Sequence, residues 1–455
     1  MSVLSLPRIL VAGASSGCGK TTVVCALLTL LCRRGVRPAA FKCGPDYIDP
    51  MFHGAVTGVG CINLDPFFCG GDLLRRLTAE NAAGHDLAVI EGVMGYYDGT
   101  GGSGTENSSY TVARETASPV VLVLSAKGTA ASTLAVIEGF ANFLPESNIA
   151  GVVFNHVAPA TYAYLKKLCA SRFGEKICPL GYLPKLPEAC RIESRHLGLV
   201  TAAEIDSLCR RLAQTADIAE ATLDLDGFLR LARSASPLAF AAAEIPQYEP
   251  IRLAVAKDRA FCFYYKDTLA LFEKMGAKVI EFSPLADEPV GEADGLYLGG
   301  GYPELYADRL EANRVSLESV RSAVLGGMPA IAECGGFMYL GRSIDGKRMC
   351  GVLPHDSQRT PKLVRFGYIS LTARAGGVFG PTGTALRGHE FHYFDSTDCG
   401  SGFIAEKTSG TQYACAVTTP SLYAGYPHLY LPASPEAAVH FYKACLDYKH
   451  GRKTL

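Results

Sequence analysis

Short apolar runs alternate with longer amphipathic stretches along the first half of the chain. A helix is predicted at residues 23–31, and strands are predicted at residues 9–12, 38–42, 87–90, 120–124 and 149–154. Continuous apolar strands separated by helices are typical of a parallel sheet that is covered on both faces. We therefore predict an α/β fold whose ligands gather at the carboxyl ends of the strands.

A second α/β pattern follows a stretch without periodicity. Residues 241–250 contain two prolines and no repeating apolar spacing, which is typical of a linker. Beyond this linker a helix is predicted at 265–275, and strands are predicted at 251–256, 278–282, 295–298 and 329–332. A chain of 455 residues is too long for one ordinary core. We predict two α/β domains, at residues 1–243 and 251–455.

Composition narrows the classes of function. Hydrophobic residues make up 48% of the chain and charged residues 19%, with a formal net charge of -1. These values indicate a globular protein and give no sign of a nucleic-acid partner. The first eight residues lack the layout of a signal peptide, and the longest apolar run, 23–32, is too short to cross a bilayer. We expect a cytoplasmic protein with no membrane partner.

The 16 cysteines are numerous for a protein of that compartment. They form no Cys-x-x-Cys pair, so neither a zinc ribbon nor a thioredoxin-type motif is indicated. Cys18, Cys25 and Cys32 recur every seven residues, and this spacing predicts one packed face of the first helix. Most of the thiols are expected to be small core residues.

A glycine-rich loop lies between the first predicted strand and the first predicted helix. Backbone N–H groups of such a loop close around phosphate oxygens, and the following helix points its positive end at the same anion. The residues predicted to bind ATP or another nucleoside triphosphate are Gly13, Gly17, Gly19, Lys20, Thr21 and Thr22. The strict P-loop motif has glycine at the position of Ala14, so an ordinary strand-to-helix turn is the alternative, but it does not explain Gly-Lys-Thr-Thr at a helix start.

Three carboxylates near predicted strand ends are candidate magnesium or substrate ligands. Glu91 ends an apolar strand, where its carboxylate and the Thr21 hydroxyl can hold the Mg²⁺ that bridges ATP phosphates. The alternative for Glu91 is an ordinary surface acid. Asp46 and Asp49 occur in a turn-rich segment beside prolines, where aspartate is also ordinary turn chemistry.

The second domain offers a cysteine nucleophile. Cys334 lies at a sharp turn between a strand and a helix, where a helix N-terminus lowers a thiol pKa. Backbone N–H groups of Gly335 and of the 299–301 loop, including Gly301, can form an oxyanion hole. His428 is the candidate base. A buried core thiol is the alternative for the cysteine.

Two further histidines compete with His428 for the role of base. They are His389 and His392, and their spacing also allows a metal site, although two histidines without a further ligand are weak evidence for one.

Taken together, these motifs resemble the cobyrinate a,c-diamide synthase family, the ATP-dependent amidases of corrin biosynthesis. The resemblance covers nearly the whole chain, and the family's P-loop also has its glycine one place early. It is carried by residues 16–22, 42–49, 89–99, 195–199, 333–336, 388–392 and 426–429. It implies an N-terminal amidoligase domain of the dethiobiotin-synthetase-like type and a C-terminal class I glutaminase-like domain.

The resemblance implies that Cys334 attacks glutamine with His428 as general base, and that the released ammonia displaces phosphate from an acyl phosphate made with ATP. Many class I glutaminases carry an acid two residues after the histidine. Tyr430 stands there in this chain, which favours a Cys–His dyad.

The resemblance also assigns residues of the first domain. Thr21, Asp46 and Glu91 are implied Mg²⁺ ligands, while Lys42, Tyr47 and Asp49 are implied to meet the corrin. The protein could form a homodimer, which the sequence does not decide.

Three other functions stay open. A sister enzyme could amidate hydrogenobyrinate or nickel sirohydrochlorin, whereas a cobyric-acid-synthase-like enzyme is disfavoured by residues 42–49. A P-loop partitioning ATPase could carry a non-catalytic glutaminase-like module. A cysteine hydrolase with an accessory nucleotide domain would turn over without ATP or corrin.

Overall fold

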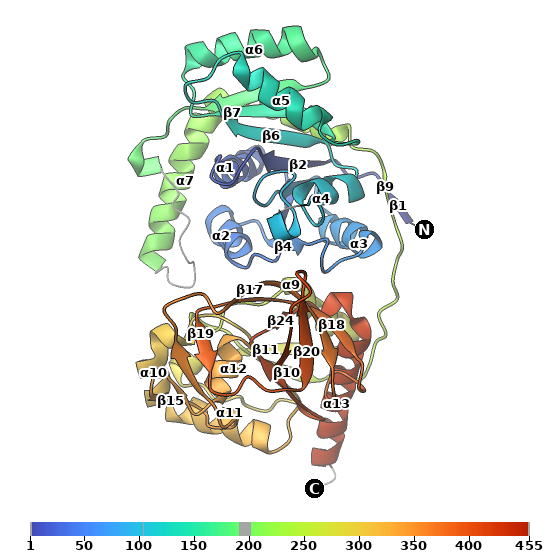
Figure 1. Cartoon of the computed structure of the whole chain (residues 1–455), viewed down its shortest axis with the longest axis vertical. Helices are drawn as coiled ribbons and strands as arrows, with labels where there is room; N and C mark the ends of the chain where they lie inside the picture. Colours follow the sequence, from blue (N-terminus) through green and yellow to red (C-terminus); the bar gives the residue numbers. More distant parts are fainter. Residues whose placement is uncertain (1, 103, 191–201, 454–455) are drawn as a thin grey trace. The chain divides into compact units, whose positions relative to one another are not determined.

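The structure is a computed structural model that describes residues 2–102, 104–190 and 202–453. It divides into two compact units, Met1–Ala243 and Glu244–Leu455 (Figure 1). The motif at residues 195–199 lies outside the described residues. Within the described residues, no helix has both the length and the apolar character that a membrane span requires.

Unit 1 is built on a seven-stranded, wholly parallel sheet in the order β4-β3-β5-β2-β6-β7-β8. Its strands are β2 (Arg8–Gly13), β3 (Pro38–Cys43), β4 (Cys61–Leu64), β5 (Leu87–Glu91), β6 (Val120–Ser125), β7 (Ile149–Asn155) and β8 (Cys178–Leu183). All residues of β2, β3 and β5 are buried. The prediction of an α/β unit with a parallel sheet is confirmed, although the sequence patterns did not predict β4 and β8.

Helices cover this sheet. They are α1 (Lys20–Arg33), α2 (Ile48–Thr57), α3 (Gly71–Ala82), α4 (Ser109–Glu115), α5 (Ser132–Asn142), α6 (Pro159–Phe173), α7 (Ala202–Thr222) and α8 (Leu225–Arg233). Strands β1 (Ser2–Leu4) and β9 (Leu238–Phe240) form a separate antiparallel pair. The core of unit 1 joins apolar side chains of α1, α7 and α8 to those of the central strands.

The predicted cysteine face of the first helix is wrong. Helix α1 begins at Lys20, so Cys18 belongs to the preceding loop. Cys25 is buried, whereas Cys32 is exposed in the last turn. A seven-residue spacing marks one packed face only where the helix exists and is covered, and Cys18 precedes α1 while Cys32 lies at its exposed end.

Unit 2 contains a six-stranded sheet in the order β11-β10-β12-β13-β23-β22, parallel except for its last strand. Its strands are β10 (Arg252–Ala256), β11 (Lys278–Phe282), β12 (Gly295–Leu298), β13 (Ala330–Glu333), β22 (Val417–Thr419) and β23 (Leu422–Gly425). Its helices are α9 (Lys266–Met275), α10 (Ala307–Ala312), α11 (Arg314–Leu325), α12 (Gly335–Leu340) and α13 (Pro435–Lys453).

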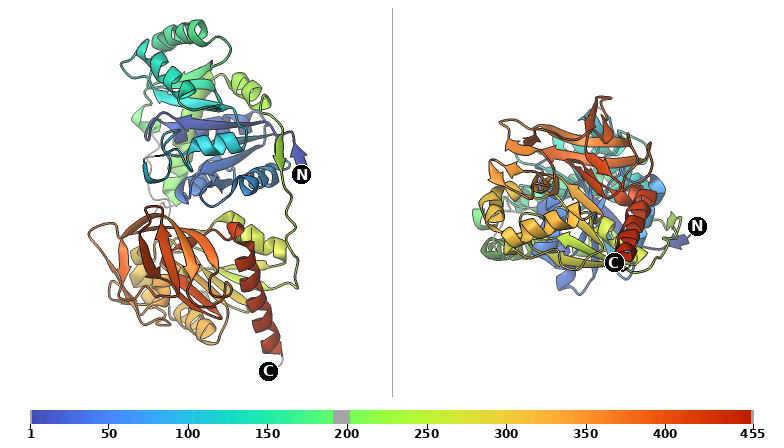
Figure 2. Two further views of the ribbon diagram at one scale, coloured as in Figure 1. Left: turned by 45° about the vertical axis from the view of Figure 1, so that its right-hand side comes forward. Right: turned by 90° about the horizontal axis from the view of Figure 1, so that it is seen from below.

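Two further sheets, one antiparallel and one mixed, complete unit 2 and were not predicted. One has the order β21-β20-β17-β18-β24 and contains β17 (Arg365–Ala373), β18 (Ala385–His392), β20 (Phe403–Lys407), β21 (Gln412–Cys415) and β24 (His428–Leu429). The other has the order β15-β14-β16-β19 and contains β14 (Ser343–Ile344), β15 (Lys347–Arg348), β16 (Asp356–Arg359) and β19 (Phe394–Ser396). Figure 2 shows these strands in orange and helix α13 in red.

Alternation along the central strands of unit 2 divides its core into two layers. Leu296 and Leu298 pack with side chains of α10, α11 and α12. Tyr297, between them, packs on the other face with α9, α13 and Ile369 of β17. Both faces of the central sheet are therefore covered, as the continuous apolar strands predicted.

Candidate nucleotide and thiol sites

The glycine-rich loop joins β2 to α1 and holds the lysine side chain inside it. Lys20 is buried, and its Nζ donates to the backbone carbonyls of Ser15, at 3.2 Å, and Met94. Gly17 and Gly19 have φ of 72° and 98°, in the region that favours glycine. The loop therefore combines two glycines in the left-handed conformation with a cation at the start of a helix, which is what an anion-binding loop requires.

The geometry explains why the first glycine stands at position 13. A Cβ on Gly13 would lie 2.6 Å from Sγ of Cys18 and 2.8 Å from Nζ of Lys20. The amide of Ala14 donates to the carbonyl of Val123 at 3.0 Å. The departure from the strict motif therefore keeps the space that Lys20 occupies.

Asn155, at the end of β7, contacts the glycine-rich loop, and this contact was not predicted. Its Nδ2 donates to the carbonyl of Cys18 at 2.8 Å. A Cβ on Gly19 would lie 2.1 Å from the same nitrogen, so the two residues are in close contact. The sequence signal was a polar residue directly after the apolar run 149–154.

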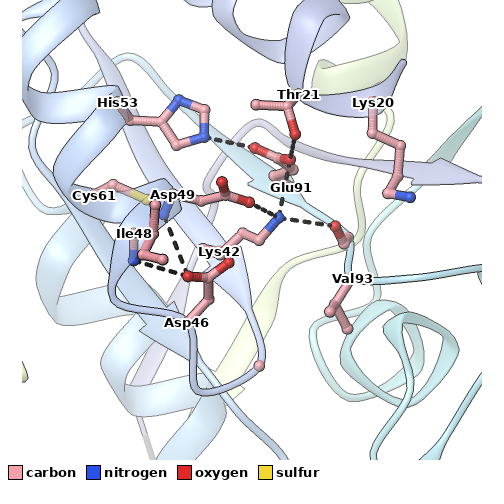
Figure 3. Close-up of polar contacts among 12 residues, drawn as sticks. Lys20, Thr21, Lys42, Asp46, Ile48, Asp49, His53, Cys61, Glu91 and Val93 are labelled. Carbon is pink, nitrogen blue, oxygen red and sulfur yellow. Dashed lines mark hydrogen bonds and ion pairs between the residues drawn. The ribbon is translucent and has the colours of Figure 1, made fainter. Parts of the chain in front are cut away.

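Glu91 is the centre of a buried polar network (Figure 3). Its Oε1 accepts from Oγ1 of Thr21 at 2.6 Å and from Nζ of Lys42 at 2.9 Å. The same Nζ lies 2.6 Å from Oδ2 of Asp49. Lys42 and Glu91 are register partners on the neighbouring strands β3 and β5. The structure thus brings together four of the residues that the sequence assigned to this site.

Mutual attraction keeps these groups charged despite their burial. Burial alone would raise the pKa of Glu91, but Lys42 and His53 hold it below the usual value of a glutamate. Burial alone would lower the pKa of Lys42, and Glu91 and Asp49 hold it well above its usual value instead. Glu91 is therefore a buried carboxylate paired with the Lys42 ammonium group, which Asp49 shares.

His53 is a member of this network that sequence reasoning missed. It is 1% exposed, its Nε2 lies 2.5 Å from Oε2 of Glu91, and its Nδ1 lies 3.5 Å from Sγ of Cys25. Residues 43–50 were predicted as a turn-rich segment, but residues 48–57 form helix α2. Asp49 and His53 are four residues apart on that helix and so share a face. Recognising the helix would have indicated the histidine.

Asp46 has a different environment from Glu91. Its Oδ1 accepts from the amides of Ile48, at 2.8 Å, and Asp49, at 3.3 Å, at the start of α2. Burial and the neighbouring Asp49 raise its pKa to about 6. Tyr47, the residue before α2, is half-buried. One oxygen of Asp46 is thus engaged in holding the helix, and its role as a metal ligand stays a prediction.

The donor set fits magnesium. Thr21 and Glu91 supply a hydroxyl and a carboxylate oxygen 2.6 Å apart beside the loop. Mg²⁺ commonly uses one or two protein oxygens, with phosphates and water as its other ligands. The described residues include no cluster of three or more His, Cys, Asp or Glu side chains arranged for a metal, so an all-protein cage is not indicated there.

Cys334 occupies the corner between β13 and α12 in unit 2. Its φ of 49° and ψ of -101° are unusual for a residue with a Cβ. Its amide donates to the carbonyl of Gly425 at 2.8 Å. The thiol is buried, and burial, followed by the nearby Glu304, raises its pKa above the usual value of a cysteine. Burial thus outweighs the predicted lowering of the thiol pKa by the helix, and Cys334 needs a base to become a nucleophile.

The two glycines assigned to the oxyanion hole lie side by side. A Cβ on Gly335 would lie 3.2 Å from the backbone nitrogen of Gly301. Gly301 has a φ of 154°. A Cβ on Gly336 would lie only 2.2 Å from the carbonyl oxygen of Leu298, which explains the glycine pair after the cysteine.

His428 lies on β24, against the same glycine loop. A Cβ on Gly300 would lie 2.3 Å from Cε1 of its ring. The histidine follows Gly425, the residue whose carbonyl holds the Cys334 amide, by three positions. Burial lowers the pKa of His428 to about 3, with His389 and His392 contributing, so its ring is neutral.

The competing histidines take part in packing. Nδ1 of His392 lies 2.6 Å from the carbonyl oxygen of Phe394, and its ring stacks on Tyr426 at 3.9 Å between centroids. The ring of His389 packs edge-on against Phe366 and Tyr368. These contacts favour an aromatic layer over a metal site.

Comparison with known proteins defines the class of this chain. Residues 9–200 match the CobQ/CobB/MinD/ParA nucleotide binding domain, and residues 252–435 match the CobB/CobQ-like glutamine amidotransferase domain. The chain therefore joins a nucleotide-binding unit to a glutamine amidotransferase unit.

Relatives match over nearly the full length. The chain is 38% identical to the cobyrinate a,c-diamide synthase of Listeria innocua, covering 96% of this chain and 99% of the relative. It is 36% identical to that of Salmonella typhimurium, covering 96% and 97%, and 40% identical to that of Streptococcus sanguinis, covering 85% and 86%. The protein belongs to the cobyrinate a,c-diamide synthase family, and the predicted resemblance is confirmed.

Proposed function

We propose that this protein converts the a and c carboxylates of cobyrinate into amides, with ATP as activator and glutamine as nitrogen donor, in cobalamin biosynthesis. The observation that carries the proposal is similarity over the whole chain to relatives named for this reaction. Both units also retain their chemical groups: the buried lysine of the loop in unit 1, and in unit 2 the cysteine corner and a neutral histidine packed against the 299–301 loop.

In unit 2, His428 takes the thiol proton of Cys334 while the sulfur attacks the side-chain amide carbon of glutamine. The C=O electron pair moves onto oxygen, where the amides of Gly301 and Gly335 donate hydrogen bonds. When the C–N bond breaks, the proton on His428 passes to the leaving NH₂ group, which departs as ammonia. A thioester on Cys334 remains, and water hydrolyses it through a second oxyanion.

In unit 1, the amides of the 13–19 loop and the ammonium of Lys20 bind the triphosphate. A corrin carboxylate attacks the terminal phosphorus, ADP leaves, and ammonia then displaces phosphate from the acyl phosphate. Lys42, paired with Glu91 and Asp49, is proposed to orient the corrin together with Asp49 and Tyr47. Thr21 and Glu91, with Asp46 as a further ligand, would hold Mg²⁺, which when bound would offset the charge on the transferring phosphoryl group.

The test is mass spectrometry of the acceptor after incubation of the full chain with ATP, Mg²⁺ and glutamine. Cobyrinate, hydrogenobyrinate and nickel sirohydrochlorin are offered separately. We expect replacement of OH by NH₂ at two sites of cobyrinate and much slower change in the other two. Faster conversion of another macrocycle would refute the substrate assignment, and no conversion of any of the three would refute the function.

The Cys334→Ser variant separates the two reactions. It should lose synthesis from glutamine and retain synthesis from free ammonia at raised pH, where more of the ammonia is unprotonated. Glutamine-driven synthesis that survives the substitution would refute the role of the thiol. A cytoplasmic location and a homodimer stay predictions from the sequence.

A further inference from the structure

A buried acid stands beside the catalytic histidine in a position that sequence reasoning did not consider. Glu333 is the last residue of β13, directly before Cys334, and it is 1% exposed. Its Oε2 lies 3.9 Å from Nδ1 of His428. The same oxygen accepts from the hydroxyl of Tyr297 at 3.0 Å, and Oε1 accepts from the amide of Leu429 at 3.0 Å. Both oxygens are thus fixed in orientation next to the imidazole.

The fold explains why an acid at this position meets the histidine. Strand β13 pairs with β23, so Glu333 is the register partner of Gly425. The chain then turns through residues 426–427 and enters β24, whose second residue, Leu429, is bonded to the carboxylate. One side chain therefore links the strand that ends at the nucleophile to the short strand that carries the base.

The position where many class I glutaminases have an acid is used differently here. Tyr430 is buried, and its hydroxyl donates to Oδ2 of Asp267 at 3.1 Å. Its ring packs edge-on against that of Tyr265, with 5.1 Å between centroids. This hydroxyl is engaged with an acid of α9, whereas the carboxylate near the histidine belongs to Glu333.

We infer that Glu333 is the positioning residue of the thiol site, accepting the Nδ1–H of His428 and orienting the ring so that Nε2 faces the thiol. This inference rests on the proposed function. When the proton moves from Sγ of Cys334 to Nε2, the carboxylate stabilises the resulting imidazolium. When that proton passes to the leaving NH₂ group, the histidine becomes neutral again, and Glu333 neither gains nor loses a proton.

The distance and the environment agree with this role. Hydrogen bonds between catalytic groups are often long in substrate-free enzymes and shorten in the complex with substrate. Burial raises the pKa of Glu333, while the hydrogen bonds from Leu429 and Tyr297 favour its ionised form, and burial lowers the pKa of His428. Either charge alone is therefore disfavoured at this position, and a carboxylate and an imidazolium stabilise each other there.

The test compares two variants of the full chain that disturb the same carboxylate. Glu333→Gln keeps the shape and an acceptor for Leu429, but it places a neutral amide beside His428. We expect kcat for glutamine hydrolysis to fall at least about tenfold, because loss of an orienting acid leaves the wrong tautomer and an unstabilised imidazolium. KM for glutamine and amide synthesis from free ammonia should stay within about twofold of the wild type.

Tyr297→Phe is the matched control, because it removes a hydrogen bond to the same oxygen without touching the histidine. Its kcat should stay within about threefold of the wild type, a loss below the roughly tenfold one expected for an orienting acid. Alkylation of Cys334 by iodoacetamide, followed on its peptide by mass spectrometry, should slow in Glu333→Gln and not in Tyr297→Phe. This readout reports thiolate formation and does not depend on turnover.

Three results would overturn the inference: wild-type kcat in Glu333→Gln, equal losses in both variants, or an unchanged alkylation rate. If Glu333→Gln does not fold, Glu333→Asp replaces it, and a wild-type kcat in that shortened variant would equally overturn it. A wild-type chain that does not hydrolyse glutamine would refute the proposed function instead, so the two failures are distinguishable.

Discussion

Gly13 is the position where the nucleotide loop leaves no room for a side chain, and Gly13→Ala tests that geometry. The added Cβ would lie 2.6 Å from Sγ of Cys18 and 2.8 Å from Cδ of Lys20. Non-bonded carbon atoms prefer about 3.5–4.0 Å, so Lys20 must withdraw by roughly 1 Å. Such overpacking costs about 1–3 kcal/mol. Because this cost falls on the position that Lys20 takes when ATP is bound, the affinity for ATP should fall about 5- to 150-fold.

The assay is ATP affinity by titration calorimetry, with thermal unfolding of each variant as a check on folding. Gly139→Ala is the matched control, because Gly139 lies in α5 and an added Cβ there meets nothing within 4 Å. The control should bind ATP as the wild type does and gain about 0.5–1 kcal/mol of stability from better helix propensity. ATP affinity within twofold of the wild type in a folded Gly13→Ala chain would refute the reasoning.

Three further predictions concern other residues described above. Lys42→Met leaves Glu91 buried without its ammonium partner and should lower the free energy of unfolding by about 3–5 kcal/mol. The control Arg37→Met, at an exposed ion pair, should lower it by less than about 1 kcal/mol. Equal losses for the two variants in denaturant titrations would contradict this prediction. Asn155→Ala removes the hydrogen bond to the loop and should weaken ATP binding roughly fivefold, for about 1 kcal/mol, and calorimetry that finds no weakening would contradict it. Burial raises the pKa of Glu304 from 4.5 to about 7, so its stabilising contribution is complete below pH 4.5 and is lost as the pH rises to about 7, by up to about 1.4 kcal/mol per pH unit. Glu304→Gln should flatten this dependence of the unfolding free energy on pH in chemical unfolding. An unchanged dependence would exclude Glu304 as its cause.

The parallel sheets could be predicted because their strands are continuous apolar runs. Strand β5, for example, reads Leu-Ala-Val-Ile-Glu, and all five residues are buried. The two further sheets of unit 2 could not be predicted in this way. Strand β17 alternates between buried and more exposed positions over only part of its length, and pairs such as β18 with β24 join residues about forty positions apart.

The chemistry of the two sites was predictable where a motif carries it, and was missed where the fold alone brings residues together. Glycines, lysine and threonine of the loop are contiguous in sequence, and so are Cys334 and its glycines. His53 reaches Glu91 from a helix hidden by an Asp-Pro pair. Glu333 meets His428 only through strand pairing and a turn. Sequence spacing does not encode such contacts between distant segments.

The corner at Cys334 has an evolutionary consequence. Holding a residue with a Cβ at φ 49° and ψ -101° costs on the order of 1–3 kcal/mol of folding free energy, most of which glycine would avoid. A descendant released from the need to hydrolyse glutamine would therefore gain stability by exchanging this cysteine for glycine. Retention of the thiol in such an unfavourable conformation is a mark of selection for activity against stability.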